Sequence, residues 1–259
     1  MSNGLSHAMA DLSGASLALD QVLAATASVA ERISIIRAAF PGRIAFSTSL
    51  GLEDQAVLHA IAASGSKIDV FTLDTGRHFP ETLDTIAASE QRYGLAIRLV
   101  APEAADVEAL TTRDGVLGFR NSIEARRACC DVRKVRPLNK ALAGASGWIT
   151  GLRREQAISR KSVAFADFDA SMGLVKINPI ADWTLPQLEA YIAEHAIPVN
   201  ALHAQGFPSI GCAPCTRAIR PGQDPRAGRW WWEQEDASFA HKECGLHDRP
   251  VARTQDIRT

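Results

Sequence analysis

The pattern of apolar and polar positions along this chain predicts alternating helices and strands. Residues 17–40 are rich in alanine and place leucine, valine and isoleucine at helical spacing, which predicts one or two helices that end at Pro41. Short apolar runs at residues 43–47 and 68–73 predict buried strands, and each is followed by a polar loop and a helical segment. Further strands are expected at residues 96–100, 147–151 and 175–180, and further helices at residues 53–64, 123–142 and 184–195 and from Pro80 onward. Strands and helices that alternate at this spacing favour an α/β fold with a mostly parallel sheet flanked by helices.

Two polar loops follow the first two predicted strands. Residues 47–51 (STSLG) and residues 73–76 (LDTG) stand at the carboxyl ends of those strands, so a parallel sheet would bring both loops to one crevice. Hydroxyl and backbone N–H groups at a helix N-terminus suit a bound anion. Residues 47–51 lack the Gly-Lys-Ser/Thr ending of a Walker loop, so a nucleoside triphosphate with magnesium is not the first expectation. A phosphate site and an ordinary capped turn both remain open here.

The composition favours one large domain. The chain has 259 residues, 46% of them hydrophobic, which is enough to bury a sizeable core. Residues 1–16 are small and polar and we expect them to be disordered, whereas residues 17–221 are expected to form the α/β domain. Helical periodicity is lost toward the C-terminus, and we expect residues 222–259 to be a mobile tail.

Charge and hydropathy restrict the class of partner. The formal net charge is −1, so no overall positive field favours nucleic acid or an acidic membrane. The N-terminus lacks the basic start and apolar run of a signal peptide, and no stretch stays apolar for the roughly 20 residues that span a bilayer. We therefore expect a cytoplasmic protein whose partner is a small molecule or another protein. The oligomeric state stays open, a homo-oligomer included.

Four cysteines stand in two tight pairs, Cys129-Cys130 and Cys212-Ala213-Pro214-Cys215. Disulfides are disfavoured in a reducing compartment, and a bridge between adjacent residues would be strained. Structural zinc usually takes pairs separated by about two to four residues, a spacing that the adjacent pair does not have. An iron–sulfur cluster has a larger core that adjacent thiolates can reach on different irons. Spacing therefore favours a cluster, with zinc and unliganded buried cysteines as the alternatives.

The fifth cysteine, Cys244, stands between Lys242 and His247 in a polar stretch. Either basic side chain could favour the thiolate, which is the nucleophilic form. An incidental exposed thiol is the alternative interpretation.

Eight motifs together resemble the assimilatory adenylyl-sulfate reductases of the PAPS/APS reductase family. They occupy residues 46–54, 73–76, 129–138, 151–156, 178–183, 211–216, 228–233 and 243–247, in the order seen in that family. The resemblance implies an adenine-nucleotide α-hydrolase-like (PP-loop) fold, so that residues 17–221 would be a nucleotide-binding reductase domain. Relatives that use 3′-phosphoadenylyl sulfate generally lack both cysteine pairs, so this chain is more similar to those that prefer adenylyl sulfate.

The resemblance also implies a mechanism and a cofactor. Cys244 in the C-terminal tail would attack the sulfur of adenylyl sulfate, releasing AMP and leaving an S-sulfocysteine, which thioredoxin or glutaredoxin would resolve with release of sulfite. One 4Fe-4S cluster would be held by Cys129, Cys130, Cys212 and Cys215, with a structural and electrostatic role because the dithiol of thioredoxin already supplies both electrons. Lys134, one helical turn from Cys130, would couple the cluster to the substrate.

The substrate-binding residues implied by the resemblance lie in the loops and in basic positions. They are Ser47, Thr48, Ser49, Gly51, Asp54, Leu73, Asp74, Thr75, Gly76, Lys134, Gly151, Arg160, Arg226, Arg229 and His247. A reductase of 3′-phosphoadenylyl sulfate or of both nucleotides is the main alternative. An ATP-using PP-loop enzyme and a non-enzymatic iron–sulfur sensor are the others.

Overall fold

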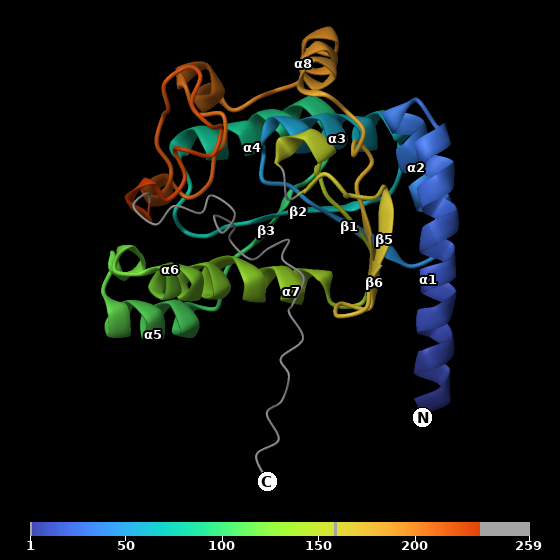
Figure 1. The fold of residues 1–259 in the computed structure, drawn as a ribbon, viewed down its shortest axis with the longest axis horizontal. Coiled ribbons are helices and arrows are strands. Elements are labelled where there is room, and N and C mark those ends of the chain that lie inside the picture. The colour runs from blue at the N-terminus through green and yellow to red at the C-terminus, as the bar shows by residue number, and fades with distance from the viewer. Residues whose placement is uncertain (1, 158–159, 234–259) are drawn as a thin grey trace.

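The computed structural model describes residues 2–157 and 160–233, with side chains from Leu12 onward. In these ranges six strands form one sheet in the order β3-β2-β1-β4-β6-β5 (Figure 1). All neighbouring strands are parallel except β5 and β6. The strands are β1 (Arg43–Ser47), β2 (Asp69–Leu73), β3 (Arg98–Val100), β4 (Ala145–Ile149), β5 (Ala166–Asp169) and β6 (Leu174–Ile177). The expected α/β fold with a mostly parallel sheet is confirmed.

Helices cover both faces of the sheet. The α-helices are α1 (Ser2–Ala25), α2 (Val29–Ala39), α3 (Leu52–Ser64), α4 (Pro80–Tyr93), α5 (Ala104–Asp114), α6 (Ile123–Cys130), α7 (Arg136–Leu142) and α8 (Leu185–Glu194). A π-helical turn, η2 (Asp131–Val135), joins α6 to α7, and short 3₁₀ turns occur at η1 (Gly118–Arg120), η3 (Arg154–Gln156), η5 (Ala201–Gln205), η6 (Ala213–Cys215) and η7 (Trp231–Glu233). Helices α3, α4 and α8 lie on one side of the sheet and α5, α6 and α7 on the other, while α1 runs along the β5 edge (Figure 1).

The side chains of β1 alternate between two cores. Ile44 and Phe46 pack in the core formed with α2 and α3, whereas Ala45 packs in the core formed with α7. Successive side chains of a strand point to opposite faces, and here both faces are covered. This explains why residues 43–47 form a continuous apolar run rather than an alternating one.

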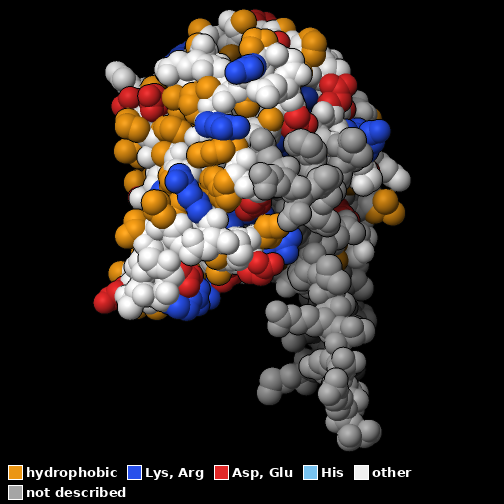
Figure 2. All heavy atoms as spheres, turned by 60° about the vertical axis from the view of Figure 1, so that its left-hand side comes forward, with side chains coloured by type: hydrophobic (Ala, Val, Ile, Leu, Met, Phe, Trp, Pro, Cys, Tyr) orange, Lys and Arg blue, Asp and Glu red, His pale blue; other side chains and the backbone are white. Residues whose placement is uncertain are grey.

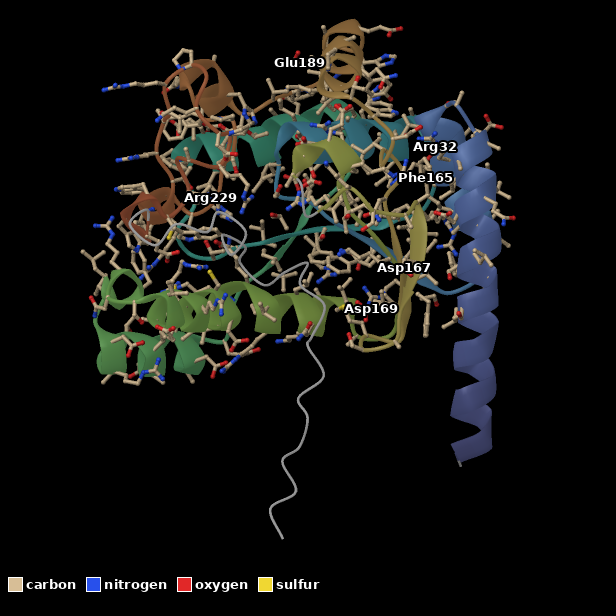
Figure 3. All side chains as sticks on the ribbon, viewed as in Figure 1. Arg32, Phe165, Asp167, Asp169, Glu189 and Arg229 are labelled. Carbon is tan, nitrogen blue, oxygen red and sulfur yellow. The ribbon has the colours of Figure 1, made fainter. Side chains whose placement is uncertain are left out.

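A buried arginine closes the edge of the larger core. Arg32 of α2 donates to both carboxylate oxygens of Asp182 at 2.7 and 2.9 Å, and its guanidinium lies 4.6 Å from the centre of the Phe165 ring. The side chains of Arg32 and Phe165 lie side by side near α2 and β5 (Figure 3). Because Arg32 is almost fully buried, this pairing fixes the segment that follows β6 to the N-terminal helices.

Strand β1 lies at the point where the order of the strands reverses. The chain passes from β1 to β2 and β3 on one side and then returns to add β4 on the other, and ligands of open α/β sheets bind at such a point. Ladder hydrogen bonds extend one residue past the strand ends, from Thr48 N to Phe71 O (2.8 Å) and from Thr150 N to Ile177 O (2.9 Å). The loops that follow β1 and β4 therefore start from fixed positions.

Several expected boundaries differ from the structure. Residues 2–16, expected to be disordered, form the first part of α1, and the antiparallel strand β5 was not expected. Part of the expected tail is packed on the domain, because Thr216 bridges Arg229 and Trp230 is 1% exposed. The remainder of that tail, residues 234–259, lies outside the described residues. Within the described ranges, no helix has both the length and the apolar character needed to cross a membrane.

Candidate functional site

The loop after β1 is held by its own side chains. Leu50 adopts a left-handed backbone conformation (φ 62°), and its N–H donates to the Thr48 hydroxyl at 3.0 Å. The N–H and hydroxyl of Ser49 both donate to Asp54 Oδ2 at 2.6 Å. Gly51 caps α3 without a side-chain hydrogen bond. The loop thus presents the N-terminus of α3, with its partial positive charge, at the carboxyl edge of the sheet.

Asp54 is buried beneath this loop. Burial raises the pKa of its carboxyl to about 6, although hydrogen bonds from Ser49 and Gly151 oppose the increase. A Cβ atom on Gly151 would lie 2.3 Å from Asp54 Oδ1, so any larger residue there would displace the carboxylate. Two predicted site residues, Asp54 and Gly151, are therefore in direct contact, and together they join the start of α3 to the end of β4.

The loop after β2 connects the sheet to the cysteine segments. Gly76 has a positive φ of 66°, and its N–H donates to Asp74 Oδ1 at 2.9 Å, which closes a tight turn. The carbonyl of Thr75 accepts from Arg133 Nη1 at 2.7 Å, and its hydroxyl lies 3.3 Å from Cys212 Sγ. One threonine thus contacts a cysteine of the second pair and an arginine three residues after the first pair.

The four paired cysteines line a single cavity. Cys129 and Cys130 end α6, whereas Cys212 caps the start of the turn η6 and Cys215 is its last residue. The cavity between them holds about 280 Å³ of space not filled by protein atoms, part of it open to solvent. The other side chains that line it are Arg77, Phe119, Arg126, Arg133 and Lys134. The π-helical turn directly after Cys130 carries Arg133 and Lys134, and such turns are frequent at functional sites.

The spacing of these four thiols distinguishes a site for a single metal ion from a site for a cluster. All four thiols are free of disulfides. In the described part of the chain, no three Cys, His, Asp or Glu side chains converge closely enough to hold a single metal ion. A zinc site would need four sulfurs at about 2.3 Å from one point, whereas a cluster core separates its ligands. Four thiols spaced around a cavity and surrounded by basic side chains therefore fit a cluster better than a single ion.

The thiols also respond differently to their surroundings. Burial, together with the neighbouring Cys212 and Cys130, raises the pKa of Cys215 to about 12. Burial opposes ionisation of Cys212 as well, but the charge of Lys134, the Thr75 hydroxyl and the charges of Arg229 and Arg77 outweigh it and lower the pKa. Thiolates that line one cavity repel one another, so full ionisation requires additional positive charge between them.

The remaining predicted residues lie around this region or beyond the described chain. Arg160, in the loop after β4, donates to Gln156 Oε1 at 2.6 Å. The Arg229 guanidinium lies 4.8 Å from the centre of the Trp230 ring, in the segment opposite α6 (Figure 3). Arg226 also lies near that ring, at 5.8 Å. Basic side chains are interspersed with hydrophobic ones across this end of the molecule (Figure 2). Cys244 and His247 lie outside the described residues.

Three basic residues of the cavity, Arg77, Arg126 and Arg133, were missed from the sequence, and two of them stand close to predicted site residues. Arg77 directly follows the loop at residues 73–76, and Arg133 stands between Cys130 and Lys134. Adjacency to a predicted motif was the available signal, but surface arginines are common, and only the fold shows that both face the cavity.

Comparisons with known proteins agree on one family. Residues 43–218 match the family described as phosphoadenosine phosphosulfate reductase domain, a range that contains both loops and all four paired cysteines. An adenosine 5′-phosphosulfate reductase from Agrobacterium fabrum is 52% identical over 239 residues, 92% of this chain and 90% of the relative. Another from Allochromatium vinosum is 50% identical over 212 residues, 82% of this chain and 81% of the relative. A crystal structure of phosphoadenylyl-sulfate reductase from Candida auris, a phosphate complex, has a TM-score of 0.67 at 26% identity and covers 79% of this chain and 96% of that one.

Proposed function

We infer the activity from the family to which this chain belongs, the phosphoadenosine phosphosulfate reductases, and propose that it reduces adenylyl sulfate to sulfite and AMP in sulfate assimilation. Relatives about half identical to it over most of their length are adenosine 5′-phosphosulfate reductases. The observation that carries the proposal is the position of the four-cysteine cavity, which adjoins the loop after β2 through Thr75. The loop that we propose to contact the nucleotide thus also borders the thiol-lined cavity.

The proposed substrate site lies at the carboxyl edge of the sheet. The N-terminus of α3 suits the phosphate of the nucleotide. Lys134, Arg226, Arg229 and His247 would offset the charge of the phosphosulfate, because a group that leaves as AMP develops negative charge. The residues proposed to contact the nucleotide are Ser47, Thr48, Ser49, Gly51, Asp54, Leu73, Asp74, Thr75, Gly76, Gly151 and Arg160. Asp54 and Gly151 would act through the loop conformation, given their contact with each other.

The proposed cofactor is one 4Fe-4S cluster on Cys129, Cys130, Cys212 and Cys215. When bound, it would supply a fixed charged group that joins the end of α6 to the turn η6. Lys134, which lines the same cavity, would hold its ammonium group between this charge and the phosphosulfate. The electrons for the reaction come from the protein reductant, so none needs to be stored at this site.

The proposed nucleophile is Cys244. Its thiolate forms a bond to the sulfur of adenylyl sulfate while the sulfur–oxygen bond to phosphate breaks, and AMP leaves with the bonding electron pair. A thiolate of thioredoxin, or of glutaredoxin, then attacks Cys244 Sγ and displaces sulfite, and its second thiol closes the reductant's disulfide. Two electrons pass from the dithiol to sulfur, so the overall reaction balances.

The covalent intermediate provides the decisive test. Purified protein mixed with adenylyl sulfate but no reductant is expected to gain the mass of one SO₃ group by intact-protein mass spectrometry. Wild-type protein mixed with AMP, and Cys244→Ser mixed with adenylyl sulfate, should show no gain. Reduced thioredoxin should then restore the original mass and release sulfite. An unmodified wild-type protein would refute the assignment of Cys244.

Preference between the two nucleotides is a separate question, because the matched structure is a phosphoadenylyl-sulfate reductase. We expect kcat/KM for adenylyl sulfate to exceed that for 3′-phosphoadenylyl sulfate, since the four cysteines are present. Equal values would indicate an enzyme that uses both nucleotides.

A further inference from the structure

Arg77 lies between the loop after β2 and the four-cysteine cavity, and three contacts hold it there. Its backbone carbonyl accepts from Ala213 N at 2.8 Å, next to Cys212. Its Nη2 donates to Val116 O at 2.7 Å, and its guanidinium lies 4.8 Å from the centre of the Phe119 ring. Backbone and side chain are therefore both fixed, and little freedom is left to the guanidinium.

Another nitrogen of the Arg77 guanidinium, Nη1, indicates an additional hydrogen-bond partner. Arg77 Nη1 is buried and has no hydrogen-bond partner among the described residues. Buried donors are nearly always paired in folded proteins. The side chain lines the four-cysteine cavity, and it lines the smaller adjoining cavity that also reaches Cys129. The missing acceptor is therefore expected in the space that the cysteines surround.

The chemistry of that space suits a guanidinium. Thiolate ligands and sulfide ions accept hydrogen bonds, and donors of this kind tune both the potential and the stability of iron–sulfur groups. A planar guanidinium fixed at Nη2 can direct Nη1 without losing further freedom. Arg77 directly follows the loop after β2, so its position depends on the conformation of residues 73–76.

We propose that Arg77 donates through Nη1 to a sulfur atom of the cofactor held by the four cysteines and shields that cofactor from oxidation. This inference rests on the proposed function, because it requires the cluster to be present. It adds a residue outside the cysteine motifs to the surroundings of the cluster and links the loop after β2 directly to it.

Arg120 provides a matched control. Its guanidinium also lies near the Phe119 ring, at 5.6 Å, and its Nη2 donates to Pro214 O at 3.3 Å. It is exposed and does not line the four-cysteine cavity. Loss of Arg120 therefore removes an equal charge from the same region without removing a donor to the cavity.

The experiment uses anaerobically purified full-length protein. Iron and sulfide are first measured in the wild type, Arg77→Gln, Arg77→Lys and Arg120→Gln, and ferricyanide, which removes one electron at a time, is then added while the visible absorbance is followed. Arg77→Gln is expected to bleach about 10-fold faster than the wild type, the scale typical of lost outer ligand contacts. Arg77→Lys should bleach at an intermediate rate. Lysine keeps the charge, but its single ammonium group cannot contact the Val116 carbonyl and an acceptor in the cavity as the two guanidinium nitrogens do. Arg120→Gln should match the wild type.

The possible outcomes separate the two claims. Wild-type protein without iron and sulfide would refute the cofactor and the role of Arg77 with it. Bleaching of Arg77→Gln at the wild-type rate, or equal acceleration in Arg120→Gln, would refute the role of Arg77 alone. If Arg77→Gln does not fold, Arg77→Lys decides the question in the same way. Thermal unfolding of the cluster-free proteins distinguishes this role from a merely structural one. A structural role of Arg77 would lower the melting temperature of its variants without a specific change in the bleaching rate.

Discussion

The buried carboxyl of Asp54 should make the stability of this protein depend on pH. Burial raises its pKa from the usual 3.8 to about 6. Because the folded-state pKa lies above the unfolded value, folding favours the protonated carboxyl. Stability is therefore lost as the pH rises from about 4 through 6, and the loss is complete above that range. The increase corresponds to about 3 kcal/mol, of which about 1.4 kcal/mol falls between pH ~5 and ~8.

Asp54→Asn isolates this contribution. The variant keeps the shape of the side chain but has a single acceptor oxygen, so one of the donors from Ser49 or Gly151 loses its partner, at about 1–3 kcal/mol. That loss does not depend on pH. The difference in unfolding free energy between variant and wild type should therefore shift in favour of the variant by about 1.4 kcal/mol from pH ~5 to ~8.

Urea unfolding at several pH values measures this difference, and titrations common to both proteins cancel. Asp69→Asn is the control, because hydrogen bonds from Arg98 and Arg43 outweigh the effect of burial and lower the pKa of Asp69. Its difference from the wild type should stay flat over the same pH range. A flat difference for Asp54→Asn as well would refute the idea that a destabilised carboxylate lies beneath the loop after β1.

Three further changes test the site and its supports. Gly151→Ala should destabilise the protein by about 1–3 kcal/mol in urea unfolding, because the added methyl group meets Asp54 Oδ1; no change would contradict the close approach. Glu233→Gln should destabilise by about 3 kcal/mol, because it removes the 2.5 Å ion pair with buried Arg126; hydrogen exchange should show the loss concentrated at residues 213–233. Lys134→Ala should reduce turnover and alter the cluster spectrum, and normal turnover with an unaltered spectrum would end the proposed coupling.

The sequence predicted the central strands well because their signals are local. Residues 43–47 match β1, and the run at residues 68–73 matches β2 to within one residue, since each is a short apolar segment bounded by polar residues. Strand β5 was missed because Asp167 and Asp169 alternate with Ala166 and Phe168, and its position depends on pairing with β6. The start of α1 was missed because its serines and glycines give no helical periodicity.

The site was predicted in parts rather than as an arrangement. The cysteine spacing indicated a shared ligand, but nothing in the sequence showed that α6 passes into a π-helical turn at Asp131 and brings Arg133 to the cavity. The contact between Asp54 and Gly151 joins residues far apart in the chain. Such proximity depends on the order of the strands, which hydrophobic periodicity does not encode.

Thr75 changes how the two halves of the site are connected. Lys134 is proposed to couple the cluster to the substrate through charge, an interaction that acts across space. The Thr75 carbonyl and hydroxyl contact Arg133 and Cys212 directly, while the same loop closes through Asp74 and Gly76 at the end of β2. A nucleotide that shifts this loop must therefore shift groups beside both cysteine pairs. Coupling between substrate and cluster through this backbone would persist in Lys134→Ala. The change that the substrate causes in the cluster spectrum of this variant, as a fraction of the wild-type change, therefore measures how much of the coupling passes through Thr75.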